Sequence, residues 1–151
     1  MRTNRFVFQL FALIAVVAVL LAPAPAPEPY TQIHLLGASG TLSDLPQDVA
    51  AGELSTVKVV VQNQMGGPME YELTIGIPLD GQYYNHGTLD WDSTHTIQPG
   101  DALTYEFSLA KGASFVGDLS FRLESTGRQQ LMFDLTGPGV SEQVWLWIVV
   151  A

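Results

Sequence analysis

From residue 30 onward the chain alternates apolar and polar residues in short runs, and this period of two constrains the fold more than any other feature. The clearest run is MEYELTIGI, in which Met69, Tyr71, Leu73 and Ile75 share one face of a strand and polar residues lie between them. Gly, Pro, Asp and Asn separate the runs, and no segment keeps a helical period of 3.6 residues. The pattern therefore predicts an all-β domain.

The runs predict about seven to eight strands with turn signals between them. Turns at this spacing favour an antiparallel immunoglobulin-like β-sandwich, with a small barrel or jelly roll as the alternative. The irregular segment 78–95 is expected to hold a loop and a short edge strand. The other strands are expected at residues 31–36, 55–62, 69–77, 102–109, 119–124, 130–135 and 143–150.

The last of these runs, QVWLWIVV, is apolar on both faces at its end. A strand with two apolar faces is typical of a central or covered position in a sheet. We therefore expect Trp145 and Trp147 to pack in the core, although one of them could face a partner.

A different pattern occupies the first 29 residues, where a basic head is followed by an apolar run and then by PAPAPEP. Residues 6–22 have a single polar member, Gln9. A helix of this length spans roughly 26 Å, close to the lower limit for crossing a bilayer. The chain is thus divided into a signal-anchor or transmembrane helix at 1–22, a proline-rich stalk at 23–29 and an ectodomain at 30–151.

The residues around a possible cleavage site favour a retained anchor. Signal peptidase requires small residues before the cleaved bond, and each small residue available here, Ala22, Ala24 and Ala26, is followed by proline. Arg2 and Arg5 would stay on the cytoplasmic side. The expected location is the cell membrane, single-pass, with the C-terminal domain extracytoplasmic. Secretion after signal cleavage is the alternative.

After Arg5 the chain carries four basic residues against all fifteen acidic ones, a net charge of −11. Such a balance argues against nucleic acid and anionic lipid headgroups as partners. The chain has no cysteine, so its fold depends on the core without disulfides, and thiolate chemistry is excluded.

The stretch from IHLLG to YELTI resembles the extracytoplasmic domain of the DUF1616 family of archaeal and bacterial membrane proteins. The matching motifs are an LLG strand end, an x-D-x-P turn, a G-E turn and a V-x-N strand end, at residues 35–37, 44–46, 52–53 and 61–63. The L-W-I pattern at 146–148 is similar to the end of the family's last strand. The likeness covers about 31–77 and 96–150, and it implies architecture and location rather than chemistry.

The segment 78–95 gathers the polar and aromatic side chains that could form a site. Its histidines and aspartates are weak candidates for a divalent metal, because imidazole and carboxylate are common ligands: His86, Asp90, Asp92 and His95. Their spacing matches no named motif, and DWDSTH lacks the glycine and terminal glutamate of a calcium loop. We therefore expect no metal site and no cofactor.

Three aromatic residues of the same segment, Tyr83, Tyr84 and Trp91, are the candidates for an interaction patch. Aromatic side chains on loops are common at interfaces and on sugar-binding surfaces, and they also cap sandwich cores. The sequence leaves these alternatives open.

Nothing in the sequence indicates catalysis, because G-x-S-x-G is absent and no nucleophile has an evident base. The sequence therefore predicts a non-enzymatic, membrane-anchored, extracytoplasmic interaction or structural module. Its expected role is an accessory subunit of a membrane or cell-envelope assembly, with the membrane and a protein as partners. The alternative is a ligand- or carbohydrate-binding surface module that uses the 83–95 loop.

Overall fold

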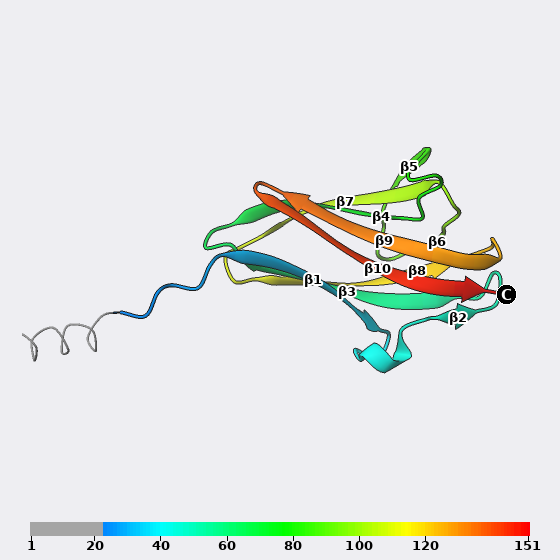
Figure 1. Ribbon diagram of the computed structural model, residues 1–151, viewed down its shortest axis with the longest axis horizontal. Helices are drawn as coiled ribbons and strands as arrows, with labels where there is room; N and C mark the ends of the chain where they lie inside the picture. Colours follow the sequence, from blue (N-terminus) through cyan, green and yellow to red (C-terminus); the bar gives the residue numbers. More distant parts are fainter. Residues whose placement is uncertain (1–22) are drawn as a thin grey trace, which may run out of the picture.

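The computed structural model describes residues 23–151. Residues 23–29 have no regular secondary structure, are exposed, and lead away from the domain (Figure 1). The membrane helix expected at 1–22 lies outside the described residues. Within residues 23–151, no helix has the length and apolar character needed to span a bilayer.

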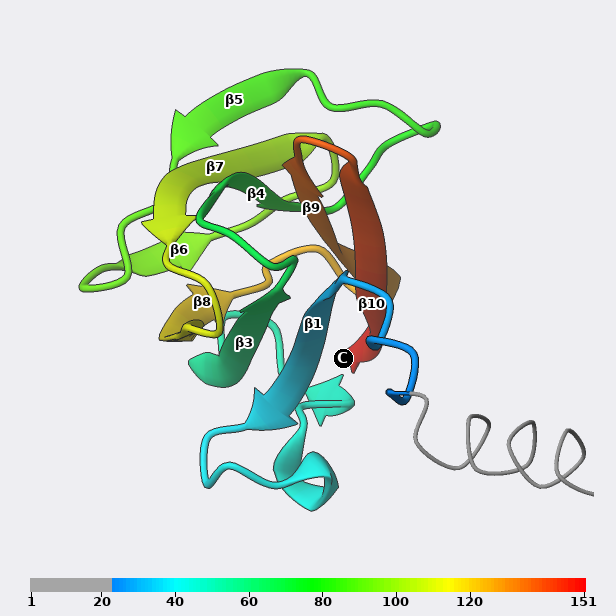
Figure 2. The ribbon, with the colours of Figure 1, turned by 90° about the vertical axis from the view of Figure 1, so that its left-hand side faces the viewer.

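The strands of the described region form two layers, seen in Figure 2 from the end at which residues 23–29 leave the domain. One sheet has four strands in the order β1-β3-β8-β6, and the other has six in the order β2-β10-β9-β4-β7-β5. The strand bounds are β1 (Tyr30–Gly37), β2 (Asp48–Val49), β3 (Ser55–Gln64), β4 (Met69–Gly76), β5 (Asn85–Thr88), β6 (Thr94–Thr96), β7 (Asp101–Leu109), β8 (Ser114–Arg122), β9 (Gly127–Gly137) and β10 (Val140–Val150). One short 3-10 helix, η1 (Leu42–Asp44), follows β1.

The core lies between the two sheets and is built from alternate residues of the long strands. On β4, Leu73 and Ile75 are fully buried, whereas Glu70 and Glu72 are exposed. This is the arrangement expected from the period of two, because successive side chains point to opposite faces of a sheet. The largest fully buried side chains include Phe121, Phe133, Leu73, Ile75, Ile97, Leu119, Leu123 and Leu131.

The structure confirms the all-β sandwich, but residues 23–151 form ten strands rather than seven to eight. The difference comes from the short strands β2, β5 and β6, and the segment 78–95 contributes to two strands rather than one. Each of the three pairs in parallel with a longer neighbour, whereas the long strands pair antiparallel. These strands pair over only two to four residues, and such short pairing depends on where a loop brings the chain beside a longer strand. The alternation of apolar and polar residues in the sequence does not predict that position.

Strand β8 begins at Ser114, five residues before the expected start at 119. Gly117 interrupts the apolar pattern there, and it allows the ring of Trp91 to approach the strand backbone closely. A Cβ at this position would lie 2.7 Å from Cε3 of Trp91 and 2.9 Å from Cζ of Phe115. The glycine is therefore part of the strand, and it makes room for an aromatic ring.

The expectation of a covered last strand is wrong for one face of β10. Leu146 and Ile148 fill the core, but Trp145 and Trp147 point outward and are 52% and 42% exposed. Their predicted core packing is therefore incorrect. The reason is that no element of residues 23–151 covers the outer face of this strand, and β2 pairs only with its last two residues.

Candidate functional site

Trp91 lies in the connection between β5 and β6, where it packs into an aromatic row at the side of the sandwich between β7 and β8. Its ring makes an edge contact with the ring of Tyr105 and a tilted contact with that of Phe115, with ring centroids 5.6 and 5.2 Å apart. Tyr105 in turn stacks on Phe107 at 5.4 Å. The indole Nε1 of Trp91 is buried without a hydrogen-bond partner. Trp91 thus has the surroundings of a side chain that closes the core.

Tyr83 and Tyr84 have different surroundings from Trp91 and from each other. Tyr83 lies over β4, where a Cβ on Gly76 would be 2.7 Å from the Tyr83 ring. Burial, and secondarily the negative charge of Asp134, raise the pKa of Tyr83 to about 12. Tyr84 is 59% exposed. The three candidate aromatic residues are therefore not gathered into one patch.

The candidate metal ligands divide in a similar way. Asp90, Asp92 and His95 share one turn, whereas His86 lies on β5 opposite Ala102. One carboxylate oxygen of Asp90 accepts the Ser93 hydroxyl at 2.7 Å, and the other accepts the backbone N–H of Asp92 at 3.0 Å. The Ser93 hydrogen bond is the main reason that the pKa of the Asp90 carboxyl is lowered.

His95 completes this turn, because its Nε2 atom lies 2.9 Å from the carbonyl oxygen of Asp90. The Asp90 carboxylate, the Ser93 hydroxyl and the His95 ring thus find their hydrogen-bond partners within this turn. Within residues 23–151, no three His, Cys, Asp or Glu side chains are grouped so that they could hold a metal ion.

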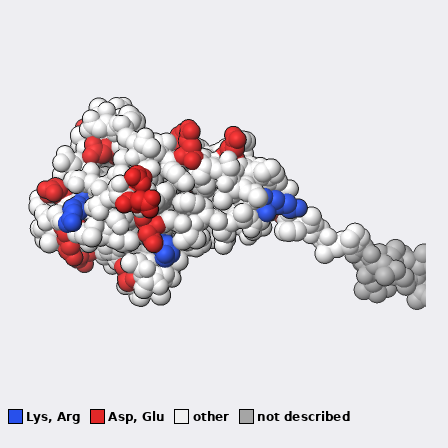
Figure 3. All heavy atoms as spheres, turned by 180° about the vertical axis from the view of Figure 1, so that it is seen from behind, with Lys and Arg blue, Asp and Glu red and all other residues white. Residues whose placement is uncertain are grey.

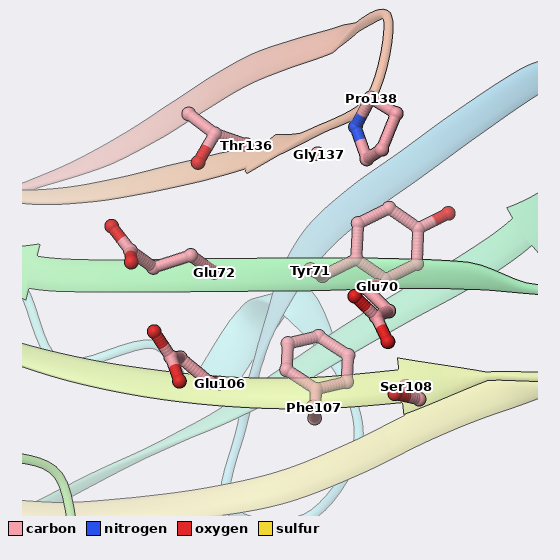
Figure 4. A pocket seen from close by; sticks show the side chains of 9 residues that line it. All are labelled: Glu70, Tyr71, Glu72, Glu106, Phe107, Ser108, Thr136, Gly137 and Pro138. Atoms are coloured by element: carbon pink, nitrogen blue, oxygen red, sulfur yellow. The ribbon is translucent and has the colours of Figure 1, made fainter.

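The outer face of the six-stranded sheet is hollowed over β4 and β7, where three glutamates line a shallow depression of about 470 Å³ (Figure 4). Glu72 lies directly opposite Glu106, with Glu70 two residues along β4. Like charges in this position repel each other. Lys58 and Asp118 form the one ion pair of residues 23–151, so these glutamates have no basic partner there.

Acidic side chains are also spread over the face of the molecule shown in Figure 3, with few basic ones among them. Any partner that approaches these surfaces therefore meets a predominantly negative field.

A different surface lies on the same sheet over β9 and β10. Trp145, Trp147 and Val149 follow one another on the outer face of β10, and Val149 is 46% exposed. We call these three residues the β10 strip. Large apolar side chains exposed in a row are uncommon on a monomer and typically mark an interaction site.

Residues of β9 surround the β10 strip. Trp145 is paired with Met132, Trp147 with Gln130 and Val149 with Arg128. The guanidinium of Arg128 lies over the indole of Trp147, 4.1 Å from the ring centroid. This stacking holds both side chains in place at the surface.

The sequence predicted core packing for Trp145 and Trp147, with contact to a partner as the alternative for one of them, and it did not predict the β10 strip as a whole. The run QVWLWIVV has apolar residues on both faces. One face fills the core, and the other either lies under another element or forms a contact surface. Only the tertiary structure distinguishes these two cases.

No protein-family model matches the chain, and no curated protein matches it. Among solved structures, the chain is similar to the CARDB domain of a Pyrococcus furiosus protein. A crystal structure of that domain, in complex with di-metal ions, has 12% identity and a TM-score of 0.54, covering 84% of this chain and 97% of that one. Its solution NMR structure has 13% identity and a TM-score of 0.51, covering 83% and 98%.

At this level of identity the likeness concerns the fold alone. It supports the immunoglobulin-like type of sandwich over most of the chain. The resemblance to DUF1616 stays a prediction, since CARDB is a different family.

Proposed function

We propose that this chain is a non-enzymatic interaction module that binds a protein partner through the outer face of β9 and β10. Residues 1–22 would anchor it in the cell membrane, and the proline-rich stalk would hold the sandwich on the extracytoplasmic side. Its role would be that of an accessory subunit in a membrane or envelope assembly. The observation that carries the proposal is the exposed β10 strip.

The β10 strip has the composition of a binding centre. Tryptophan and arginine are the residues most enriched where truncation costs binding energy, and such residues lie in apolar centres with polar rims. Here Trp147 and Arg128 already stack together, so docking would cost little side-chain entropy. Around them, Gln130, Asp134 and Gln143 supply polar groups for a rim.

The segment 83–95 is less suited to binding a ligand or carbohydrate. Trp91 is held in the aromatic row, and the Asp90 carboxylate is occupied within its own turn. Of the candidate aromatic residues, Tyr84 is the exposed one. A sugar-binding surface needs aromatic faces that are open and close together, which these positions do not supply.

A photo-crosslinking amino acid in place of Trp147 tests the proposal in cells that make the full chain. The matched control carries the same amino acid in place of Val116, which is 55% exposed on the other sheet. We expect a defined adduct from position 147 and none from position 116. Absence of an adduct at 147, or equal labelling at both positions, would contradict the proposed docking surface.

The membrane anchor is tested separately by the intact mass of the chain recovered from membranes. A mass that includes residues 1–22 supports the anchor. An N-terminus near residues 23–30 would instead show a cleaved signal peptide and a secreted module.

A further inference from the structure

We propose that the partner of the β10 strip is a second copy of this chain, docked across a two-fold axis. The structure supports this through the order of residues on the outer face of β9 and β10. Leu131 and Leu146 pair at the centre of this region, and both point into the core. The outer residues on either side of this pair are placed symmetrically.

On β10, Trp145 and Trp147 are each one residue from the centre. On β9, Asp134 and Arg128 are each three residues from the centre, one on either side. The face thus carries tryptophan in the middle, a carboxylate at one end and a guanidinium at the other. Six residues of strand separate the two charges by about 20 Å.

This pattern is self-complementary under one symmetry operation. Consider an axis that lies in the interface, runs across the strands and passes over the Leu131–Leu146 pair. It turns the face onto itself with the strand direction reversed, so Trp145 meets Trp147 of the second copy. Arg128 then meets Asp134 of the second copy, and symmetry makes this contact twice.

The state of the two charged side chains fits such a contact. The guanidinium of Arg128 lies over the Trp147 ring, and within residues 23–151 its N–H groups have no carboxylate partner. Asp134 accepts a hydrogen bond from the side-chain amide of Gln143, which orients the carboxylate and leaves it further acceptor capacity. Each group is therefore positioned for a partner that its own copy does not supply.

Charge also explains why the pairing must be in register. Apart from Arg128, the basic residues of 23–151 are Lys58, Lys111 and Arg122, and fifteen acidic residues outnumber them. Lys58 is paired with Asp118, and Arg122 donates to the carbonyl oxygen of Gly52 at 2.7 Å. Two copies repel each other in most orientations, whereas this one aligns opposite charges and buries the tryptophans.

The size of the face sets the expected affinity. Two strands with four outer residues each, of which Met132 is buried, offer less than the roughly 800 Å² per partner that stable dimers bury. We therefore expect a dissociation constant in the micromolar to millimolar range, on the order of 10⁻⁵ to 10⁻³ M. Short tethers produce effective concentrations of about a millimolar, so copies held at one surface would still pair.

The test uses the full chain in detergent micelles, with the dissociation constant measured by sedimentation equilibrium. Arg128→Glu and Asp134→Arg are each expected to weaken self-association at least about tenfold, because each places like charges at both ends of the face. An equimolar mixture of the two variants is expected to regain the original affinity, since both pairs then join opposite charges. Lys111→Glu, in the exposed turn between β7 and β8, lowers the net charge by the same amount as Arg128→Glu and serves as its control.

Circular dichroism establishes that each variant is folded. Self-association that is absent in the original chain, not rescued in the mixture, or weakened equally by Lys111→Glu would overturn the dimer. The dimer rests on the proposed docking role of the β10 strip, but the two can fail separately. A monomeric chain whose position 147 still crosslinks to a different protein overturns the dimer alone, whereas no adduct at 147 removes the docking surface itself.

Discussion

The fully buried Asn63 offers the sharpest test of what holds this sandwich together. Its side-chain amide donates to the carbonyl oxygens of Gly67, Leu109 and Ala110 at 2.9, 3.1 and 3.2 Å. Its Oδ1 atom accepts the backbone N–H of Met65 at 3.0 Å. One side chain therefore joins the turn after β3 to the end of β7, which lies in the other sheet.

Replacement of Asn63 by alanine removes the partner of the Gly67 and Leu109 carbonyls and of the Met65 N–H, whereas the Ala110 carbonyl still accepts the Ala113 N–H at 3.0 Å. The bond to the Leu109 carbonyl is buried and those to Gly67 and Met65 are partly buried, and each unsatisfied buried group costs about 1–3 kcal/mol. The expected loss is therefore about 3–5 kcal/mol, a large share of the 5–15 kcal/mol that typically stabilises a domain. Asn63→Asp, which keeps the shape but removes the donors, should cost at least as much because it also buries a carboxyl group.

Equilibrium urea unfolding, followed by circular dichroism, measures both losses. The slope of the unfolding free energy against urea concentration should stay unchanged in both variants. Asn85→Ala is the matched control. Asn85 is exposed and donates one hydrogen bond to Asp101 at 2.9 Å, so its loss should cost less than about 0.5 kcal/mol. If Asn63→Asp unfolded within about 1 kcal/mol of the original chain, the hydrogen bonds would not be the source of the stability, and the reasoning would be refuted.

Three further predictions concern single positions. Gly117→Ala should lower the free energy of unfolding by about 1–3 kcal/mol in thermal melts, because its Cβ would clash with Trp91. The pKa of Tyr83 is raised from 10.0 to about 12, so its contribution to stability is complete below pH 10 and is lost as the pH rises toward 12; absorbance titration at alkaline pH should show this late ionisation. Ser93→Ala should raise the lowered pKa of Asp90 toward 3.8 in an NMR titration; the contribution of Asp90 to stability is present above 3.8 and is lost as the pH falls through the lowered pKa.

Much of the fold was predictable because, in a half-buried strand, apolar and polar residues alternate with the face to which they point. The run at 69–77 placed Leu73 and Ile75 on one face of a strand and the polar residues on the other, and in the structure the first face is buried whereas Glu70 and Glu72 are exposed. The same rule failed at Gly117, where a missing side chain looks like the end of a strand. Only the position of Trp91, which comes from a distant segment, shows why the glycine is there.

The candidate site was less predictable, because exposure depends on what lies opposite a face. Trp145 and Trp147 occupy alternate positions in an apolar run, and the sequence does not say whether another element covers them. The pairing of Asp134 with Gln143, and of Arg128 with Val149, depends on the register of the β9–β10 hairpin. The symmetry of the face therefore became visible only with that register.

The places where the chain enters and leaves the sandwich have a mechanical consequence. Residues 23–29 lead away from one end, Ala151 lies at the other, and β1 and β10 point the same way (Figure 1). A force applied between these points runs along the strands, so it loads the eight registered positions of β1 against β3 together in shear. The hydrogen bonds between β1 and β3 would then have to break together rather than one after another, which raises the barrier to forced unfolding. A sandwich connected in this way can carry tension without losing its fold.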